Sequence, residues 1–317
     1  MTRFVAGRLV QMVAVLFAVS VLTFLIFNVI PNGDPAQRMA GKSPTETQVE
    51  AIRADWGFDE PLAVQYVRTM EQVLGGEAIS YFTQLNVQQE ILAGLPRTLA
   101  LALGAAILWM VFGIALGVLG ALRAGRLSDR LLTFFALAGV SLPVFWLGAI
   151  LSHFLGYQWG LFPNGGYVPF AESPLDWAYH LVLPCATLAV LFVGFYSRLV
   201  RSNVLDTMGE DFVRTARAKG LSERRVLLAH VLRNSLIPVV TLWGLDFGAV
   251  VAGGAILTET VFDIQGVGQY AAESVGQLDV PPVLAVTLFG AFFIVALNTV
   301  VDIAYALLDP RIRVGGR

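Results

Sequence analysis

The stretch Glu210-Asp-Phe-Val-Arg-Thr-Ala-Arg-Ala-Lys-Gly-Leu-Ser-Glu-Arg-Arg225 is basic and polar in a chain where polar residues are scarce. It lies between two very apolar stretches, residues 180–200 and 236–258. Apolar stretches of about 20 residues are long enough to cross the hydrocarbon core of a membrane as helices. We therefore expect the quoted stretch to lie outside the membrane and to connect two spans.

Two short helices around a break are the local structure that this stretch predicts. Residues 212–219 suit a helix, and Gly220 fits the position just after its end, where a positive φ is easiest without a Cβ. Ser222 can cap the next helix, with Glu223 near the positive end of its dipole. The expected product is an L-shaped helix pair that projects from the membrane on its basic side. On spacing alone, an ordinary solvated loop is the alternative.

The composition is that of a membrane protein with several spans. Of 317 residues, 56% are hydrophobic and only 14% are charged, whereas soluble domains carry about 25% charged residues. A soluble enzyme is therefore excluded, and one membrane domain is expected. The single cysteine, Cys185, lies in an apolar stretch and cannot form an internal disulfide. No cluster of cysteine and histidine predicts a metal site.

Six apolar spans predict an all-α, polytopic membrane fold. The first span, Leu9 to Ile30, has roughly 22 residues, which is longer than the apolar region of a signal peptide. No small-x-small cleavage site follows it, so a retained helix is expected. The predicted spans are residues 9–30, 98–122, 131–155, 180–200, 236–258 and 283–307. They divide the chain into an N-terminal segment with the first helix (1–30), an external insert (31–96) and a core with five spans (97–317), whose polar loop covers residues 203–233.

The basic residues predict how the six spans are oriented. An even number of spans places both ends on one side, and Lys and Arg are enriched in cytoplasmic loops. With both ends inside, 16 of the 21 basic residues lie on the cytoplasmic side and five lie outside. The opposite orientation would invert this ratio, so an N-in/C-in topology is expected.

The external insert is expected to contain two helices. Ser43-Pro44-Thr45-Glu46 has the pattern of a capping box with proline at the first helical position. The helix that follows is expected to end near Gly57. A second helix is expected to begin around Asp59-Glu-Pro61 and to end before Gly75.

Three residues inside the spans are candidates for a translocation path or gate. Pro143 and Pro184 each remove a backbone hydrogen bond and bend a helix, which serves either a gate or only the shape of the fold. Asp246 is ionisable and is expected to face a cavity or a partner. A polar lining or a hydrogen bond between subunits explains Asp246 better than a proton relay, which needs a second buried ionisable group.

Other residues of the spans are expected to have structural roles. Gly113-x3-Gly117 and Gly244-x3-Gly248 predict close approach of neighbouring helices. Asp302 lies near the cytoplasmic end of the last span and is expected to pair with Arg311 or Arg313.

Several motifs give the chain a resemblance to a known family. Arg214-Thr-Ala216 followed by Gly220 is similar to the EAA loop of binding-protein-dependent ABC importer permeases, which has Glu-Ala-Ala, three residues and Gly. Arg214 stands where the general motif has Glu, Thr215 where it has the first Ala, and Arg233 where Pro is usual. The stretch resembles most the B-type permease subunits of dipeptide and oligopeptide importers. Further similar segments follow in family order at residues 57–66, 141–148, 180–187, 258–268 and 301–313.

The resemblance implies a type I ABC importer permease fold. It implies a membrane-spanning subunit of an ATP-driven importer that forms the translocation path for dipeptides or oligopeptides. In the family, the EAA loop docks into a groove on a cytoplasmic ATPase. The ATPase-coupling residues that this implies here are Asp211, Arg214, Thr215, Ala216, Lys219, Gly220, Leu221 and Ser222.

The partners that the resemblance implies are a homologous second permease subunit in a heterodimer, two ATP-binding subunits and an external substrate-binding protein. The insert at 31–96 is then either a small cap or a docking surface for the binding protein. ATP and magnesium would be bound by the partner ATPases, with no cofactor, catalytic residue or metal in this chain and no role for nucleic acid. The location implied is the cell (inner) membrane of a bacterium or archaeon, spanned several times.

Alternative functions remain at this point. Permeases of nickel and other small-solute importers share this type. A secondary transporter would show inverted repeats and paired carboxylates at the midplane, and we find neither; a scaffold or channel without a transport cycle is a further alternative. Gly41-Lys42-Ser43 is the one approach to a nucleotide-binding loop, but Ala36 stands where that motif needs glycine. The chain is therefore expected to depend on partners for ATP hydrolysis.

Overall fold

The computed structural model describes the backbone of residues 2–29, 34–41 and 44–308, and side chains within residues 7–28, 34–41 and 44–301. Every regular element in these ranges is a helix, apart from one isolated bridge between Ile79 and Asn86. The α-helices are α1 (Thr2–Val29), α2 (Pro35–Met39), α3 (Glu46–Trp56), α4 (Leu62–Gly75), α5 (Val87–Leu122), α6 (Leu127–Ser141), α7 (Val144–Leu151), α8 (Pro174–Met208), α9 (Asp211–Ala218), α10 (Glu223–Arg225), α11 (Leu232–Ser235), α12 (Ile237–Ala249), α13 (Ile256–Val261), α14 (Val267–Gln277) and α15 (Val280–Leu308). Three π-helical segments are η1 (Ser152–Gln158), η2 (Val226–Val231) and η3 (Val250–Gly254).

Five described helices are long and apolar enough to cross a membrane, and the count is six when one bent pair is taken as a single span. The bent pair is α6 with α7–η1, which meet at an angle of 99°. Pro143 lies at this break in an extended conformation. The predicted third span, residues 131–155, is therefore not one continuous helix. Proline cannot continue the hydrogen bonding of α6, and α7 packs instead across α8 and α13.

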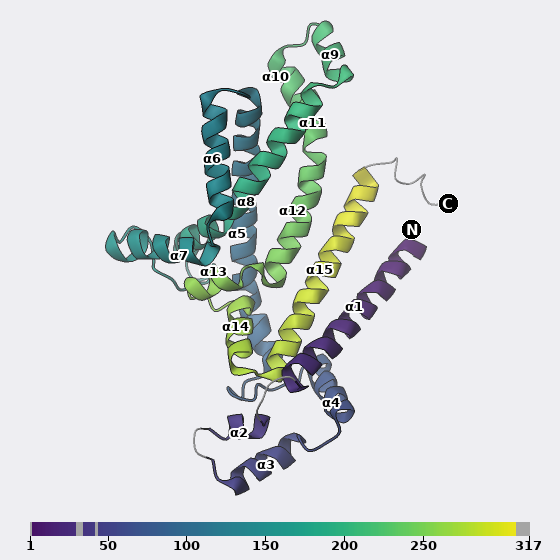
Figure 1. Cartoon of the computed structure of the whole chain (residues 1–317), viewed down its shortest axis with the longest axis vertical. Coiled ribbons are helices and arrows are strands. Elements are labelled where there is room, and N and C mark those ends of the chain that lie inside the picture. The colour runs from purple at the N-terminus through teal and green to yellow at the C-terminus, as the bar shows by residue number, and fades with distance from the viewer. Residues whose placement is uncertain (1, 30–33, 42–43, 309–317) are drawn as a thin grey trace.

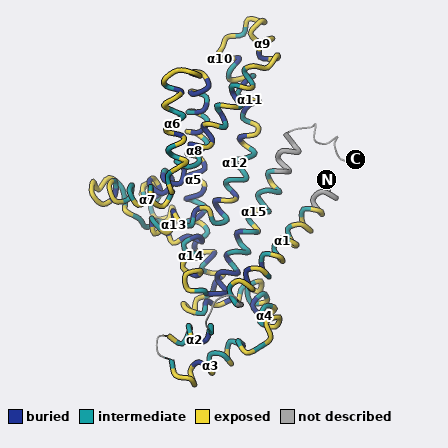
Figure 2. The backbone as a smooth tube through the Cα atoms, in the orientation of Figure 1, coloured by how far each residue is buried: buried dark blue, intermediate teal, exposed yellow. Residues whose placement is uncertain are grey.

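The centre of the fold is the long contact between α5 and α8, with α6 against α8 (Figure 1). Trp109 of α5 is fully buried and stacks on Phe192 of α8, with ring centroids 4.3 Å apart. A Cβ at Gly113 would lie 2.7 Å from the Cβ of Tyr196, and one at Gly117 would lie 2.6 Å from the Cβ of Val200. The small-residue pattern therefore allows the two helices to approach closely, as predicted. The dark buried segments of Figure 2 follow this contact.

The other pair of long helices, α1 and α15, packs side by side, and α12 packs on α15. The N-terminal end of α1 and the C-terminal end of α15 both point toward the end of the molecule that carries α9 (Figure 1). The insert helices α2–α4 lie at the opposite end. This arrangement agrees with the predicted topology, in which both chain ends share a side with the polar loop. The predicted pairing of Asp302 with the basic tail lies outside the described residues.

The insert contains the two predicted helices, but its first cap differs from the prediction. The capping residue of α3 is Thr45, whose hydroxyl accepts from the N–H of Gln48 while the Gln48 side chain accepts from Thr45. The predicted cap at Ser43 is therefore two residues early, because Gln48 completes a capping box with Thr45. The helix ends at Trp56 and Gly57, as expected.

The segment after α4 is fixed to the core by the buried Asp279. Its carboxylate accepts hydrogen bonds from the Ser80 hydroxyl at 2.6 Å and from the Tyr81 N–H at 3.1 Å. Burial raises the pKa of Asp279, and these hydrogen bonds offset part of the rise. Residues 198 positions apart are thus joined, which holds the insert against the start of α15.

We expect the two ends of the molecule to be accessible from opposite sides of the membrane. With Cys185 replaced by serine, single cysteines at Thr47 of α3 and at Ser222 beside α10 would both be exposed. A thiol reagent that cannot cross membranes should label position 47 in intact cells, and position 222 only after permeabilisation. Labelling of position 222 in intact cells would refute the N-in/C-in topology.

Candidate functional site

The polar stretch forms a helix, a tight turn and a second helix at one tip of the molecule (Figure 1). Gly220 follows α9 with φ +80°, in the left-handed region. The N–H of Gly220 donates to the carbonyl of Arg217 at 2.9 Å, and the N–H of Leu221 to that of Ala216 at 3.4 Å. These two bonds are the Schellman arrangement, which favours glycine at this position. The predicted helix, break and helix are confirmed.

The second helix starts where predicted but without the predicted side-chain cap. Ser222 occupies the capping position, and its hydroxyl makes no cap hydrogen bond. Instead, the Arg217 guanidinium donates to both carboxylate oxygens of Glu223 across the turn, at 3.0 and 3.3 Å. Both side chains are well exposed, so the pair is worth at most about 1 kcal/mol.

The underside of the turn is fixed to the membrane domain by apolar packing. Val213 and Ala216 of α9 are buried with Val226 of η2 and Val204 of α8. α9 packs on η2, and η2 packs on α8, so the underside of the turn is part of the folded core.

The outer face of the turn is exposed and mostly polar. Of the eight predicted coupling residues, Ala216 is buried and Leu221 is half-buried; those that face solvent are Asp211, Arg214, Thr215, Lys219, Gly220 and Ser222. Phe212, which the sequence reasoning omitted, is 41% exposed on the same helix. A polar rim around an exposed aromatic residue is the composition of a protein-binding surface.

A nearly continuous helical rod leads from this turn into the membrane domain. The backbone is helical from Glu223 through η2 and α11 and, after one turn residue at Leu236, through α12 into η3. Within η3, Gly253 has non-helical backbone angles, with φ +155°. Asn203 of α8 donates to the carbonyl of Ser235 at 3.2 Å, which ties the base of the rod to α8.

An ion pair joins α6 and α8 near the same tip, and the sequence reasoning did not find it. Arg201 of α8 donates to both carboxylate oxygens of Asp129 of α6, at 2.6 and 2.7 Å. The Gly125 N–H donates to the same carboxylate at 2.9 Å. The Asp129 side chain is 5% exposed. The pair connects the α5–α6 turn to α8, which carries α9.

The three candidate path or gate residues lie on separate elements. Pro143 forms the α6–α7 break, Pro184 is buried within α8 without ending that helix, and Asp246 is half-buried on α12. Asp246 accepts a hydrogen bond from the Tyr196 hydroxyl of α8 at 2.6 Å. The polar group is thus bonded within the chain, which explains its place in a span without a proton relay.

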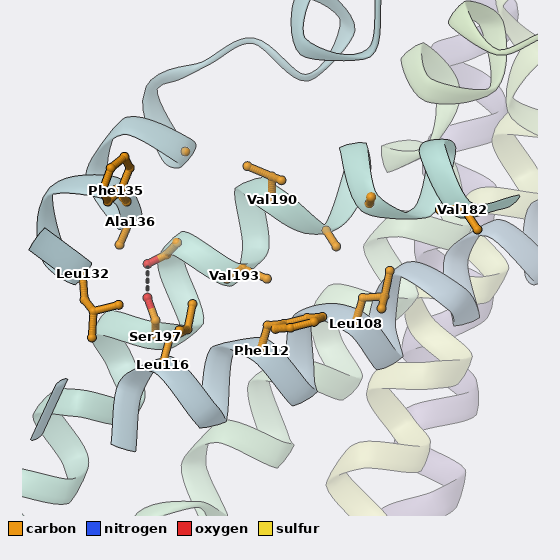
Figure 3. Close-up of a pocket in the computed structure, with 14 residues that line it drawn as sticks. Leu108, Phe112, Leu116, Leu132, Phe135, Ala136, Val182, Val190, Val193 and Ser197 are labelled. Carbon is orange, nitrogen blue, oxygen red and sulfur yellow. Dashed lines mark hydrogen bonds between the residues drawn. The ribbon is translucent and has the colours of Figure 1, made fainter. Parts of the chain in front are cut away.

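A groove of about 530 Å³ between α5, α6 and α8 is almost entirely apolar (Figure 3). The Ser197 hydroxyl beside it donates to the Gly194 carbonyl at 3.1 Å. The groove therefore offers little to a polar ligand. No group of three or more metal-ligating side chains lies within the described residues.

Comparison with protein families identifies the chain. The model of the binding-protein-dependent transport system inner membrane component matches residues 113–314, and the model of the N-terminal part of such components matches residues 1–102. The chain belongs to this permease family. Its α9–Gly220–α10 turn is the segment that resembled the EAA loop.

The permease resembles full-length relatives from several bacteria. It is 38% identical to a probable peptide ABC transporter permease of Sinorhizobium fredii, over 98% of this chain and 99% of the relative. It is 37% identical to a di/tripeptide transport system permease of Pseudomonas aeruginosa, over 99% of both chains. It is 34% identical to an oligopeptide transport system permease of Bacillus subtilis, over 98% and 99%.

A solved structure supports the fold. An inward-facing structure of the MetNI methionine ABC transporter aligns with a TM-score of 0.52 at 18% identity, covering 70% of the permease and 97% of that chain. The permease therefore has the type I importer fold, as predicted from the sequence.

Proposed function

We propose that this permease forms the translocation path for dipeptides or oligopeptides in an ATP-driven importer of a bacterial or archaeal cell membrane. The observation that carries the proposal is the exposed, rigidly based α9–α10 turn in a chain whose full-length relatives are named as peptide permeases. The expected complex contains a second, homologous permease, two ATP-binding subunits and an external substrate-binding protein. The chain itself needs no cofactor, since ATP and magnesium would be bound by the partner ATPases.

The exposed face of the turn would dock into the ATPase. The contact would use Asp211, Arg214, Thr215, Lys219 and Ser222 at the rim, with Phe212 as an apolar anchor. Val213 and Ala216 are buried where α9 packs on η2, which packs in turn on α8, so that a movement of the ATPases would reach the membrane helices. Both conformations of the transporter must be close in free energy for ATP and substrate to shift the balance between them.

The membrane helices would respond along the rod that ends at Gly253. Pro143 and Gly253 interrupt helices, and Asp246 with Tyr196 joins α12 to α8. The role of Pro143, Pro184 and Asp246 in the path or gate is part of the proposal. The insert α2–α4 at the opposite end would serve as a cap or as a docking surface for the binding protein.

We expect the isolated chain to bind and hydrolyse no nucleotide. Its one partial nucleotide-binding pattern, at Lys42, lies in the insert and lacks a required glycine. Co-expressed cognate ATPases should be retained by the affinity-tagged chain, and should be lost when Phe212, Arg214 and Lys219 are replaced by alanine. Saturable nucleotide binding by the chain alone that Lys42→Ala abolishes would refute this division of labour.

The substrate class is tested through the binding protein. Its bound ligands, released and identified by mass spectrometry, should be short peptides. A nickel chelate or another small solute would assign the permease to a different importer of the same type. Uptake by the purified chain alone, driven by an ion gradient in liposomes, would favour a secondary transporter.

A further inference from the structure

Glu259 is a fully buried carboxyl group just beyond the outer end of the rod. It lies on α13, six residues after the kink at Gly253, and its exposure is 0%. Carboxylates are almost never fully buried unless they are paired. The salt bridges formed by the described residues do not include Glu259.

One oxygen of this carboxyl group binds the start of α14. Oε2 accepts from the Gln269 N–H at 2.9 Å, and the Thr98 hydroxyl of α5 accepts from the Val267 N–H at 2.9 Å. The first N–H groups of a helix have no partner within the helix, so Glu259 and Thr98 satisfy two of them. A Cβ at Gly266 would lie 2.5 Å from Oε2, so the chain wraps closely around the group.

The other oxygen, Oε1, has no hydrogen-bond partner among the described residues. Burial raises the pKa of Glu259, and hydrogen bonds from Thr98, Gln269 and Gly268 offset part of the rise. Burial of an ionised carboxylate without a cation is unfavourable, so the neutral form is favoured. A neutral carboxyl group has one O–H donor. Since Oε2 accepts from a backbone N–H, the proton belongs on Oε1.

A small cavity lies beside this group. Its volume is about 10 Å³, which is room for about one water molecule. Glu259 and Thr98 are its polar side chains, and residues 250–253 of the kinked segment form another wall. The remaining walls come from Ala255 and Ile256, from α14 and from Val286 of α15. The cavity therefore lies where the kinked segment meets α5, α13, α14 and α15.

We propose that protonated Glu259 donates from Oε1 to one buried water molecule in this cavity, and that this water joins the carboxyl group to the backbone at the Gly253 kink. Glu259 is then a positioning residue that fastens the outer end of the rod to α5 and α14. The inference rests on the proposed function, in which the rod carries the movement of the ATPases toward the outer side.

Hydrogen exchange tests the inference without substrate or nucleotide. In the purified complex, Glu259→Gln keeps the shape and replaces the O–H donor by an N–H donor. Amide exchange in residues 250–256 and 267–270 should therefore match the parent protein. Glu259→Leu removes both hydrogen-bonding oxygens, so exchange in the same segments should rise on the order of tenfold. Glu71 is an exposed carboxylate on α4, and Glu71→Leu is the control that should change neither segment.

Transport supplies a second readout. The Glu259→Gln complex should retain uptake and substrate-stimulated ATP hydrolysis. The Glu259→Leu complex should lose uptake while its basal ATP hydrolysis continues. Fast amide exchange in Glu259→Gln would contradict the inference that Glu259 is neutral and donates a hydrogen bond. Unchanged amide exchange in Glu259→Leu would contradict the inference that Glu259 fastens the rod to α5 and α14. If Glu259→Leu does not assemble, exchange in Glu259→Gln alone decides. A complex that transports no peptide but shows the predicted exchange would refute the proposed function and leave this inference standing.

Discussion

Gly220→Val should abolish coupled transport while leaving the permease in the membrane. A β-branched residue at φ +80° costs on the order of 1–2 kcal/mol or more. Apart from its chain neighbours, no atom of the described residues lies within 4 Å of the position that a Cβ would take, so the subunit itself has space for the side chain. The strain should loosen the turn without unfolding the α5–α8 core. Reconstituted complexes should show weak ATPase binding, or binding without substrate-stimulated hydrolysis, and uptake should fall steeply.

Two controls separate this effect from general damage. Asparagine tolerates the left-handed conformation better than other residues with a Cβ, so Gly220→Asn should retain most of the uptake. Gly117→Val would force a side chain against Val200, where a Cβ alone already comes within 2.6 Å, and should reduce the amount of assembled subunit. Normal coupled uptake in Gly220→Val at normal expression would show that the turn is an ordinary solvated connection.

Arg201→Leu should have the second large effect, on the stability of the permease, because it leaves the Asp129 carboxylate without its cation while its side chain is only 5% exposed. Breaking a buried pair by removing one partner costs 3–5 kcal/mol, whereas an exposed pair is worth at most about 1 kcal/mol. Arg201 is 32% exposed, so we expect a loss of about 2–3 kcal/mol. The midpoint of thermal unfolding of the assembled complex should fall, and ATP hydrolysis should become less dependent on substrate.

Neighbouring positions provide the comparison. Arg198 is exposed on the same helix, and Arg198→Leu should change stability little. Asp129→Asn with Arg201→Leu removes both charges and should recover part of the stability lost in Arg201→Leu alone. Equal effects of Arg198→Leu and Arg201→Leu on stability and on coupling would contradict a specific role for the pair.

Local sequence signals predicted the turn well because its geometry is set within a few residues. Gly220 follows a helix at the place where a positive φ is needed, and the structure has that φ. The start of α5 was missed by about ten residues, since Asn86 caps the helix at the Gln89 N–H well before the apolar span begins. A cap of this kind looks like any other polar residue in a loop.

Contacts between distant parts of the chain could not be predicted from one sequence. Asp129 and Arg201 are 72 residues apart, and Tyr196 and Asp246 are 50 apart. Pro143 predicted a bend, but the 99° angle depends on how α7 packs against α8 and α13. Glu259 belongs to the motif at residues 258–268, but its burial follows from the packing of α13 against α14 and α5, which the sequence alone does not show.

The central claim is that the α9–α10 turn is where partner ATPases act on this permease. Thr215 is exposed on the outer face of α9, and a single cysteine there, with Cys185 replaced by serine, can be cross-linked in the assembled complex. A cysteine at Thr47 of α3, also exposed but at the opposite end, is the control. We predict strong cross-linking of position 215 to an ATPase, with a yield that changes between nucleotide-free and ATP-bound states, and none from position 47. A position 215 that cross-links no better than position 47, in a complex that still transports, would contradict the claim.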